Sequence, residues 1–157
     1  MKLTEPQALK RIAAYCSKAE RCEFDVRRKL LGWEVEPDAI DRIVDRLKKE
    51  RFLNDSRFAR SFVNDKLRFN KWGKAKIVYE LKKRKISETD YRDALNEFED
   101  EDFDEQLRHI LTIKSKSVRG KDVYDKRNKL IRFALGRGFS MDSVLRIIDQ
   151  LHREDLE

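Results

Sequence analysis

Residues that interrupt helices are scarce in this chain, which has five glycines and two prolines among 157 residues. So few turn-forming residues exclude a turn-rich β-sandwich and a glycine-rich nucleotide-binding fold. Cys16 and Cys22 are too few for a disulfide framework, and without Cys or His nearby they cannot complete a zinc site. No stretch approaches the roughly 18 apolar residues of a membrane span, and the N-terminus lacks the apolar core of a signal peptide. We therefore expect a cytoplasmic protein that does not contact a membrane.

Charge is abundant, since 43% of the residues are charged and 37 Lys and Arg outnumber 30 Asp and Glu. Many Lys, Arg, Glu, Leu and Ile with few breakers favour an all-helical protein, and nine Phe argue against disorder throughout. The net charge of +7 favours a polyanionic partner, either nucleic acid or a protein already bound to it. The alternative is that the basic residues only solvate the helix surfaces.

One apolar pattern occurs three times, with seven positions separated by gaps of 4, 5, 5, 3, 1 and 3. The three copies span residues 26–47, 77–98 and 130–151. A gap of four places two side chains on one helix face, whereas two successive gaps of five break the helical phase. Each copy therefore predicts two helices joined by a tight turn. Gly138 is expected to end one helix, Ser87 and Ser140 to cap others, and Pro37 to begin a helix.

A further amphipathic segment precedes each copy. Residues 4–7 predict a capping box before the first, Asn54 or Asp55 is expected to cap the second, and acidic residues open the third. The sequence thus predicts an all-α fold of three tandem three-helix repeats, at residues 1–50, 51–100 and 101–157. A repeat of this size buries only a small core, so adjacent repeats are expected to share surface within an elongated array that can curve.

Basic residues gather in blocks. Residues 66–85 hold nine basic residues and one acidic residue, with Trp72 among them. Lys and Arg neutralise phosphates, and Trp72 is the best candidate for stacking on an unpaired base. The alternative is a solvated helix face with Trp72 packed against a neighbouring helix. Residues 114–121 are expected to form a second basic contact surface, in a loop. The candidate partner- and nucleic-acid-binding residues are Arg68, Lys71, Trp72, Lys74, Lys76, Lys82, Lys83, Arg84, Lys114, Lys116, Arg119 and Lys121.

An acidic block, residues 88–105, carries ten acidic residues and one Arg. It could bind a divalent metal as nuclease carboxylates do, mimic nucleic acid or dock a basic protein, or form a charged junction where acids begin the next helix. The junction is favoured, because no histidine or EF-hand spacing accompanies the block. The motifs GxxxxGK, GxSxG and HExxH are missing, and His109 and His152 are interpreted as packing or surface residues. We predict no catalytic residue, no metal and no cofactor.

Several residues carry a family resemblance. The segment 53–59 (LNDSRFA) is followed at fixed gaps by Gly73, Ile77, Glu80-Leu81 and Ile86. This pattern resembles the D-x-x-F-A … G … I-x-x-E-L-x-x-x-(G)-I signature of the RecX family, bacterial regulators of the RecA recombinase. The segment 137–140 (RGFS) resembles the family's C-terminal R-G-F stretch. Lys85 stands where the family often has glycine, and Glu34 occupies the matching place in the first repeat.

The resemblance implies three tandem three-helix repeats and a protein without catalytic activity. It implies binding to the filament of RecA on single-stranded DNA, along the filament groove, with restraint of filament growth, ATP hydrolysis and strand exchange in recombination and DNA repair. It also implies contact with DNA itself, single-stranded and, as a further candidate, double-stranded. We expect a monomer. The alternative function is a stand-alone nucleic-acid-binding module of basic helices.

Overall fold

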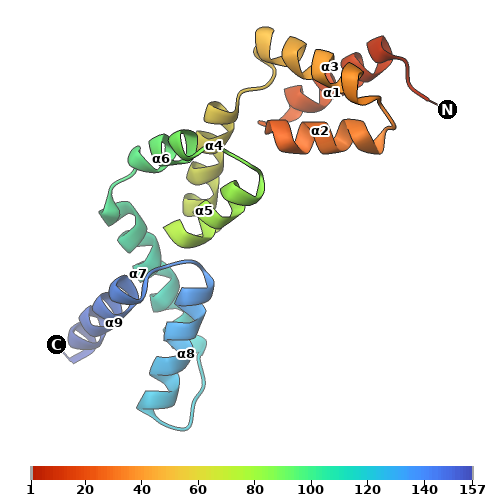
Figure 1. Ribbon diagram of the computed structural model, residues 1–157. Coiled ribbons are helices and arrows are strands. Elements are labelled where there is room, and N and C mark those ends of the chain that lie inside the picture. The colour runs from red at the N-terminus through yellow and green to blue at the C-terminus, as the bar shows by residue number, and fades with distance from the viewer. Residues whose placement is uncertain (1, 157) are drawn as a thin grey trace. The chain divides into compact units, whose positions relative to one another are not determined.

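The computed structural model describes residues 2–156, and every regular element in this part of the chain is an α-helix (Figure 1). None of these helices combines the length and the apolar character needed to cross a membrane. The all-α prediction is confirmed. In chain order the helices are α1 (Glu5–Lys18), α2 (Glu23–Gly32), α3 (Pro37–Lys49), α4 (Asp55–Arg68), α5 (Lys74–Lys83), α6 (Glu88–Asn96), α7 (Asp100–Ser117), α8 (Val123–Gly136) and α9 (Met141–Leu156).

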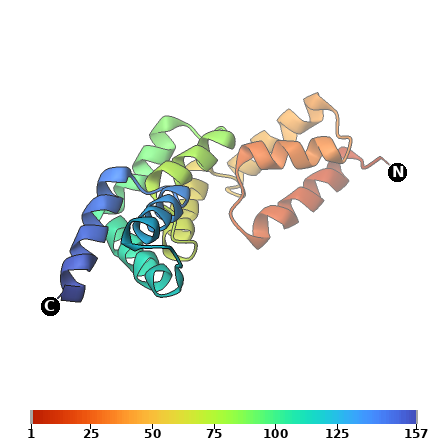
Figure 2. The same ribbon diagram turned by 90° about the horizontal axis from the view of Figure 1, so that it is seen from below.

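The first three helices enclose a core of their own, and each contacts the other two (Figures 1 and 2). All seven apolar positions of the first copy of the pattern are buried there, and Cys16 is buried beside them. No position of the second or third copy is exposed. The gaps in the sequence therefore predicted the core side chains. The buried residues of the first core are Ala8, Ile12, Cys16, Val26, Leu30, Val35, Ala39, Ile40, Ile43, Val44, Leu47 and Leu53.

Most of the predicted helix starts are confirmed. The Gln7 N–H donates to the Thr4 hydroxyl at 3.3 Å while the Thr4 N–H donates to the Gln7 side chain at 2.9 Å, which completes the capping box. The hydroxyls of Ser87 and Ser140 each accept from the backbone N–H three residues further on, at 3.2 Å in both cases. Pro37 is the first residue of α3. These contacts satisfy N–H groups that have no partner within their helix.

Asn54 and Asp55, which the sequence offered as alternative caps, cap two different helices. The Asn54 side chain accepts from the Arg57 N–H at 2.9 Å at the start of its own helix, α4. The Asp55 carboxylate instead accepts from the Glu23 N–H at 2.8 Å, at the start of α2, where Cys22 forms no side-chain cap. Burial raises the pKa of Asp55 above its ordinary value and raises that of the Cys22 thiol to about 12. The second repeat thus completes a helix of the first.

The turns inside the three repeats share one backbone conformation. The residue before the apolar turn position has a positive φ, which is 61° at Glu34, 55° at Lys85 and 96° at Gly138. In each turn the following N–H donates to the carbonyl five residues earlier, at 3.1 to 3.3 Å. This Schellman-type closure satisfies carbonyls at the helix end. It explains the gaps of five, and it places Glu34 and Lys85 in a conformation that favours glycine.

Two glycines allow backbones from different repeats to approach closely. The Gly73 N–H donates to the Arg137 carbonyl at 2.8 Å, and the Ala75 N–H donates to the Gly138 carbonyl at 3.2 Å. A Cβ atom on Gly73 would overlap the Gly138 carbonyl, and a Cβ on Gly138 would lie 2.5 Å from that of Lys76. The contact between the start of α5 and the turn before α9 therefore requires glycine on both sides.

The chain forms two compact units. One contains the residues up to 61 together with 81–92, and the other contains 62–80 together with the residues from 93 onward. The middle three-helix group contributes to both units, and each unit therefore contains a joint between neighbouring groups. The repeat boundaries at 50/51 and 100/101 stay a prediction.

Phe58 on α4 is 8% exposed. Replacing it with alanine should lower the free energy of unfolding by about 3–5 kcal/mol, because apolar burial is lost and a cavity remains. Urea denaturation followed by circular dichroism measures this change. Phe69→Ala is the matched control, since Phe69 is 77% exposed, and it should change the free energy by less than about 0.5 kcal/mol. Equal effects of the two substitutions would contradict a core position for Phe58.

Glu34→Gly should raise the free energy of unfolding by about 0.5–1 kcal/mol, because relief of the left-handed conformation exceeds the extra backbone entropy that glycine loses on folding. Lys10→Gly provides the control, because Lys10 is an exposed residue inside α1, and it should lower the free energy by about 1 kcal/mol. The denaturation midpoints of the two variants show whether each substitution raises or lowers the free energy of unfolding. Destabilisation by Glu34→Gly would show that the turn carries no such strain.

Candidate nucleic-acid interface

Part of the predicted basic surface gathers on the loop between α4 and α5. Lys71 has a φ of 57°, and its ammonium group donates to the Arg68 carbonyl at 2.5 Å, so it closes the end of α4. The Trp72 N–H donates to the Lys66 carbonyl at 3.0 Å. The loop is therefore held to the end of α4 by its own hydrogen bonds.

The Trp72 ring is half-buried and lies between lysines. It packs edge-on against Phe62, with ring centroids 6.3 Å apart. The ammonium groups of Lys66 and Lys76 lie 4.9 and 4.5 Å from its centroid. Trp72 therefore packs against a neighbouring helix, as the alternative interpretation of the sequence held, and it also orders two cations through cation–π contacts. Stacking of Trp72 on a base stays a prediction.

The turn that follows α8 in the third repeat forms hydrogen bonds with the loop between α4 and α5, which we call the Trp72 loop. The guanidinium of Arg137 donates to the Asn70 carbonyl at 3.1 Å, and the Arg137 carbonyl accepts from the Gly73 N–H at 2.8 Å. Arg137 therefore binds both ends of the segment that carries Trp72. Sequence reasoning did not assign this role to Arg137, because the two partners are 67 residues apart in the chain. Lys66 is not among the predicted residues, although its spacing of four from Phe62 on one helix indicates that the two side chains lie together.

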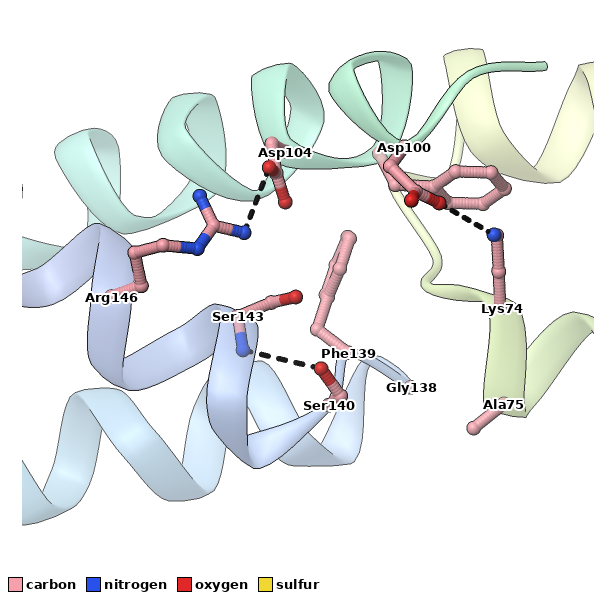
Figure 3. A pocket seen from close by; sticks show the side chains of 10 residues that line it. Lys74, Ala75, Asp100, Asp104, Gly138, Phe139, Ser140, Ser143 and Arg146 are labelled. Atoms are coloured by element: carbon pink, nitrogen blue, oxygen red, sulfur yellow. Dashed lines mark hydrogen bonds and ion pairs between the residues drawn. The ribbon is translucent and has the colours of Figure 1, made fainter.

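Lys74, a predicted binding residue, takes part in the joint between repeats. Its ammonium group pairs with Asp100 at 2.9 Å, and this hydrogen bond holds the pKa of Asp100 below its ordinary value. Arg146 pairs with Asp104 at 2.8 Å. Both ion pairs lie on a cavity of about 370 Å³ that Phe139 also lines. Figure 3 shows the two pairs and Phe139 between them. Because both carboxylates already bind cations from other helices, they fit the charged-junction interpretation of the acidic block. Among the described residues, no three Asp, Glu, His or Cys side chains gather as a metal site would require.

The prediction of a basic loop at residues 114–121 is wrong for its first half. Helix α7 continues to Ser117, so Lys114 and Lys116 lie on its last turn. No glycine or proline interrupts the helix before Val118, and the hydroxyls of Ser115 and Ser117 donate to the carbonyls of Thr112 and Lys114. The Lys114 ammonium lies 5.1 Å from the ring centroid of Phe133 on α8.

Arg119 and Lys121 lie in the loop before α8, as predicted. The Trp72 loop, by contrast, is bonded to the turn that follows α8. The 14 residues of α8 separate these two positions, a length of about 21 Å. The two basic segments are therefore distinct surfaces.

The remaining candidates, Lys82, Lys83 and Arg84, belong to the other compact unit. Arg84 pairs with Asp25 of α2 at 3.6 Å, and the Lys82 ammonium lies 5.9 Å from the ring centroid of Tyr91. Arg84 therefore joins the first and second repeats. Of the predicted residues, Arg68, Lys71, Trp72, Lys74 and Lys76 lie together on and beside the loop between α4 and α5.

The three tandem three-helix domains define this chain as a helical-repeat protein. Comparison with models of known protein families shows to which family of such proteins it belongs. Models of the RecX family match the chain in order: the first three-helix domain at residues 8–47, the second at 54–95 and the third at 100–148. The chain belongs to the RecX family of regulatory proteins.

Named relatives agree with this assignment. The chain is 28% identical over 152 residues to the regulatory protein RecX of Clostridium acetobutylicum, covering 94% of this chain and 70% of that protein. It is 30% identical over 151 residues to the regulatory protein RecX of Ralstonia pickettii, covering 92% and 88%. It spans less of some other clostridial relatives, for example 63% of the protein from Clostridium perfringens strain 13.

Solved structures share the fold. A crystal structure of regulatory protein RecX superposes with a TM-score of 0.85 at 23% identity, over 92% of this chain and 73% of that one. The crystal structure of RecX from Lactobacillus salivarius superposes with a TM-score of 0.81 at 24% identity, over 94% and 96%. At these identities the likeness establishes the fold alone.

Arg137→Ala should release the Trp72 loop, because the Asn70 carbonyl loses its donor. In a Trp33→Phe background Trp72 is the one remaining tryptophan of the two in the chain. Its emission should shift to the red and acrylamide should quench it more strongly, with a loss of about 1–2 kcal/mol of stability. Arg132→Ala removes the same charge from an exposed position of α8 and should leave the emission unchanged. An unchanged emission in Arg137→Ala would contradict the positioning role.

Proposed function

We propose that this chain regulates a RecA-type recombinase by binding the recombinase filament on single-stranded DNA and restraining its growth, ATP hydrolysis and strand exchange. The observation that carries the proposal is the ordered match of all three RecX domain models, together with relatives named as regulatory proteins. The protein acts as a monomer in the cytoplasm, without catalytic activity of its own.

The basic surfaces supply the means of binding. Lys66 and Lys76 take part in no ion pair among the described residues, so their charges remain available to phosphates beside Trp72. Arg119 and Lys121 offer a second contact about one helix length away. Several modest contacts on tandem domains bind an extended partner with higher avidity than any single contact. Lys74 and Arg84 are better assigned to the joints between repeats, because each is already paired with a carboxylate.

The function is tested directly on a bacterial recombinase. Purified protein added to recombinase-coated single-stranded DNA should lower both ATP hydrolysis and strand exchange at concentrations no higher than that of the recombinase. Co-sedimentation should show binding to the coated DNA above that to bare DNA. Unchanged ATP hydrolysis and strand exchange would overturn the proposal.

A stand-alone nucleic-acid-binding module is the second candidate, favoured by the two unpaired ammonium groups at Trp72. It requires tight binding to bare DNA or RNA with a steep dependence of affinity on salt. Equal binding to coated and bare DNA, without an effect on the recombinase, would favour this candidate.

Lys66→Gln combined with Lys76→Gln should weaken binding to recombinase-coated DNA about tenfold at moderate salt, because two phosphate contacts are lost. The control is Arg42→Gln combined with Arg46→Gln, which removes the same charge from cations that are already paired with Glu5 and Glu50. Co-sedimentation gives the affinities, and circular dichroism checks that the helices are retained. Equal affinities of the two double variants would show that the Trp72 surface, formed by Trp72, Lys66 and Lys76, is not part of the interface.

A further inference from the structure

The first repeat carries a row of alternating cations and aromatic rings that its charge pattern did not reveal. The Arg21 guanidinium lies 3.9 Å from the Tyr15 ring centroid, and the Lys29 ammonium lies 4.4 Å from it. Lys29 is also 5.8 Å from the Trp33 centroid, and the Arg11 guanidinium lies 5.4 Å from the same ring. We call this row, Arg21–Tyr15–Lys29–Trp33–Arg11, the cation–aromatic ladder. Arg11 and Lys29 are exposed, and the other three are half-buried.

The three acidic residues between Arg11 and Trp33 in the sequence bind cations outside the ladder. Glu20 pairs with Arg57 at 2.6 Å, and Asp25 pairs with Arg84 at 3.6 Å. Glu23 is held by Arg27 and by a further lysine. Among the described residues, no cation of the ladder takes part in an ion pair. The rings therefore order the cations without neutralising them.

Three other arginines of the same repeat form ion pairs with carboxylates. Arg42 pairs with Glu5 at 2.7 Å, Arg46 pairs with Glu50 at 3.0 Å, and Arg27 pairs with Asp41 at 2.8 Å as well as with Glu23. These cations stabilise contacts within and between helices. The ladder cations instead lie against rings, and Arg21 also donates to the Tyr15 carbonyl, so their charge is left for a partner.

We propose that the cation–aromatic ladder is a binding site for single-stranded nucleic acid, separate from the Trp72 surface. Three cations spaced by two rings match a chain of regularly spaced negative charges, whereas a single acidic side chain would meet only one of them. Guanidinium planes also offer surfaces on which unpaired bases stack, whereas the carboxylates of an acidic peptide do not stack. The ladder adds a contact to the proposed function but does not require a recombinase, so its test and that of the proposed function fail separately.

The test uses the full chain and fluorescein-labelled oligothymidylate. Arg11→Gln combined with Lys29→Gln removes two ladder charges and keeps both rings. Fluorescence anisotropy should show about a tenfold loss of affinity near 0.1 M salt, and the slope of log affinity against log salt should fall by about 1.4, because each single-strand phosphate contact contributes about 0.7. The double variant of the paired cations Arg42 and Arg46 should keep the slope of the parent protein. An equal loss in both double variants, or in neither, would overturn the proposal.

Two further measurements complete the test. In a Trp72→Phe background Trp33 is the one remaining tryptophan, and oligothymidylate should quench its emission if strands bind at the ladder. Polyglutamate of equal charge should compete weakly, by at least tenfold less than oligothymidylate. Unquenched Trp33 emission would place the strand elsewhere. Stronger competition by polyglutamate that the Arg11/Lys29 double variant abolishes would show that the ladder binds acidic protein, which would overturn the choice of nucleic acid.

Discussion

A three-helix domain of about fifty residues buries little apolar surface and is therefore only marginally stable alone. The contacts between neighbouring domains follow from this limit. Neighbouring domains form hydrogen bonds with each other at buried or glycine-lined positions. Asp55 accepts from the Glu23 N–H across one joint, and the Gly73 N–H donates to the Arg137 carbonyl across the other. Each joint satisfies backbone groups that a single domain leaves unpaired, so the domains depend on their neighbours as repeat proteins do.

The local features of the fold could be predicted from the sequence, because they follow from spacing and from residues within one turn. The three apolar copies located the core, and Thr4, Pro37, Ser87 and Ser140 cap or begin helices as expected. Contacts between residues distant in the chain could not be predicted. Asp55 has the appearance of an ordinary cap for its own helix, and nothing in a single sequence indicates that its carboxylate reaches Glu23.

The candidate site was predicted only in part, because charge along the chain does not state which cations are already paired. The block at residues 66–85 has nine basic residues and one acidic residue, yet Lys74 and Arg84 bind carboxylates and Lys71 closes a helix. The cation–aromatic ladder could not be predicted from the sequence for the converse reason. Its residues are scattered over positions 11–33, among acidic residues whose charge is consumed by cations elsewhere. Available charge depends on pairing, and pairing is a property of the tertiary structure.

The placement of the Asp55 carboxylate on the first turn of α2 has a consequence for biosynthesis. A ribosome delivers residues 5–49, the three helices of the first domain, before it delivers residue 55. Until then the Glu23 amide has only water as its partner, and Cys22 supplies no substitute. The first domain to be synthesised therefore receives a helix cap from the second. A nascent chain arrested between the two domains would have a frayed first turn in α2.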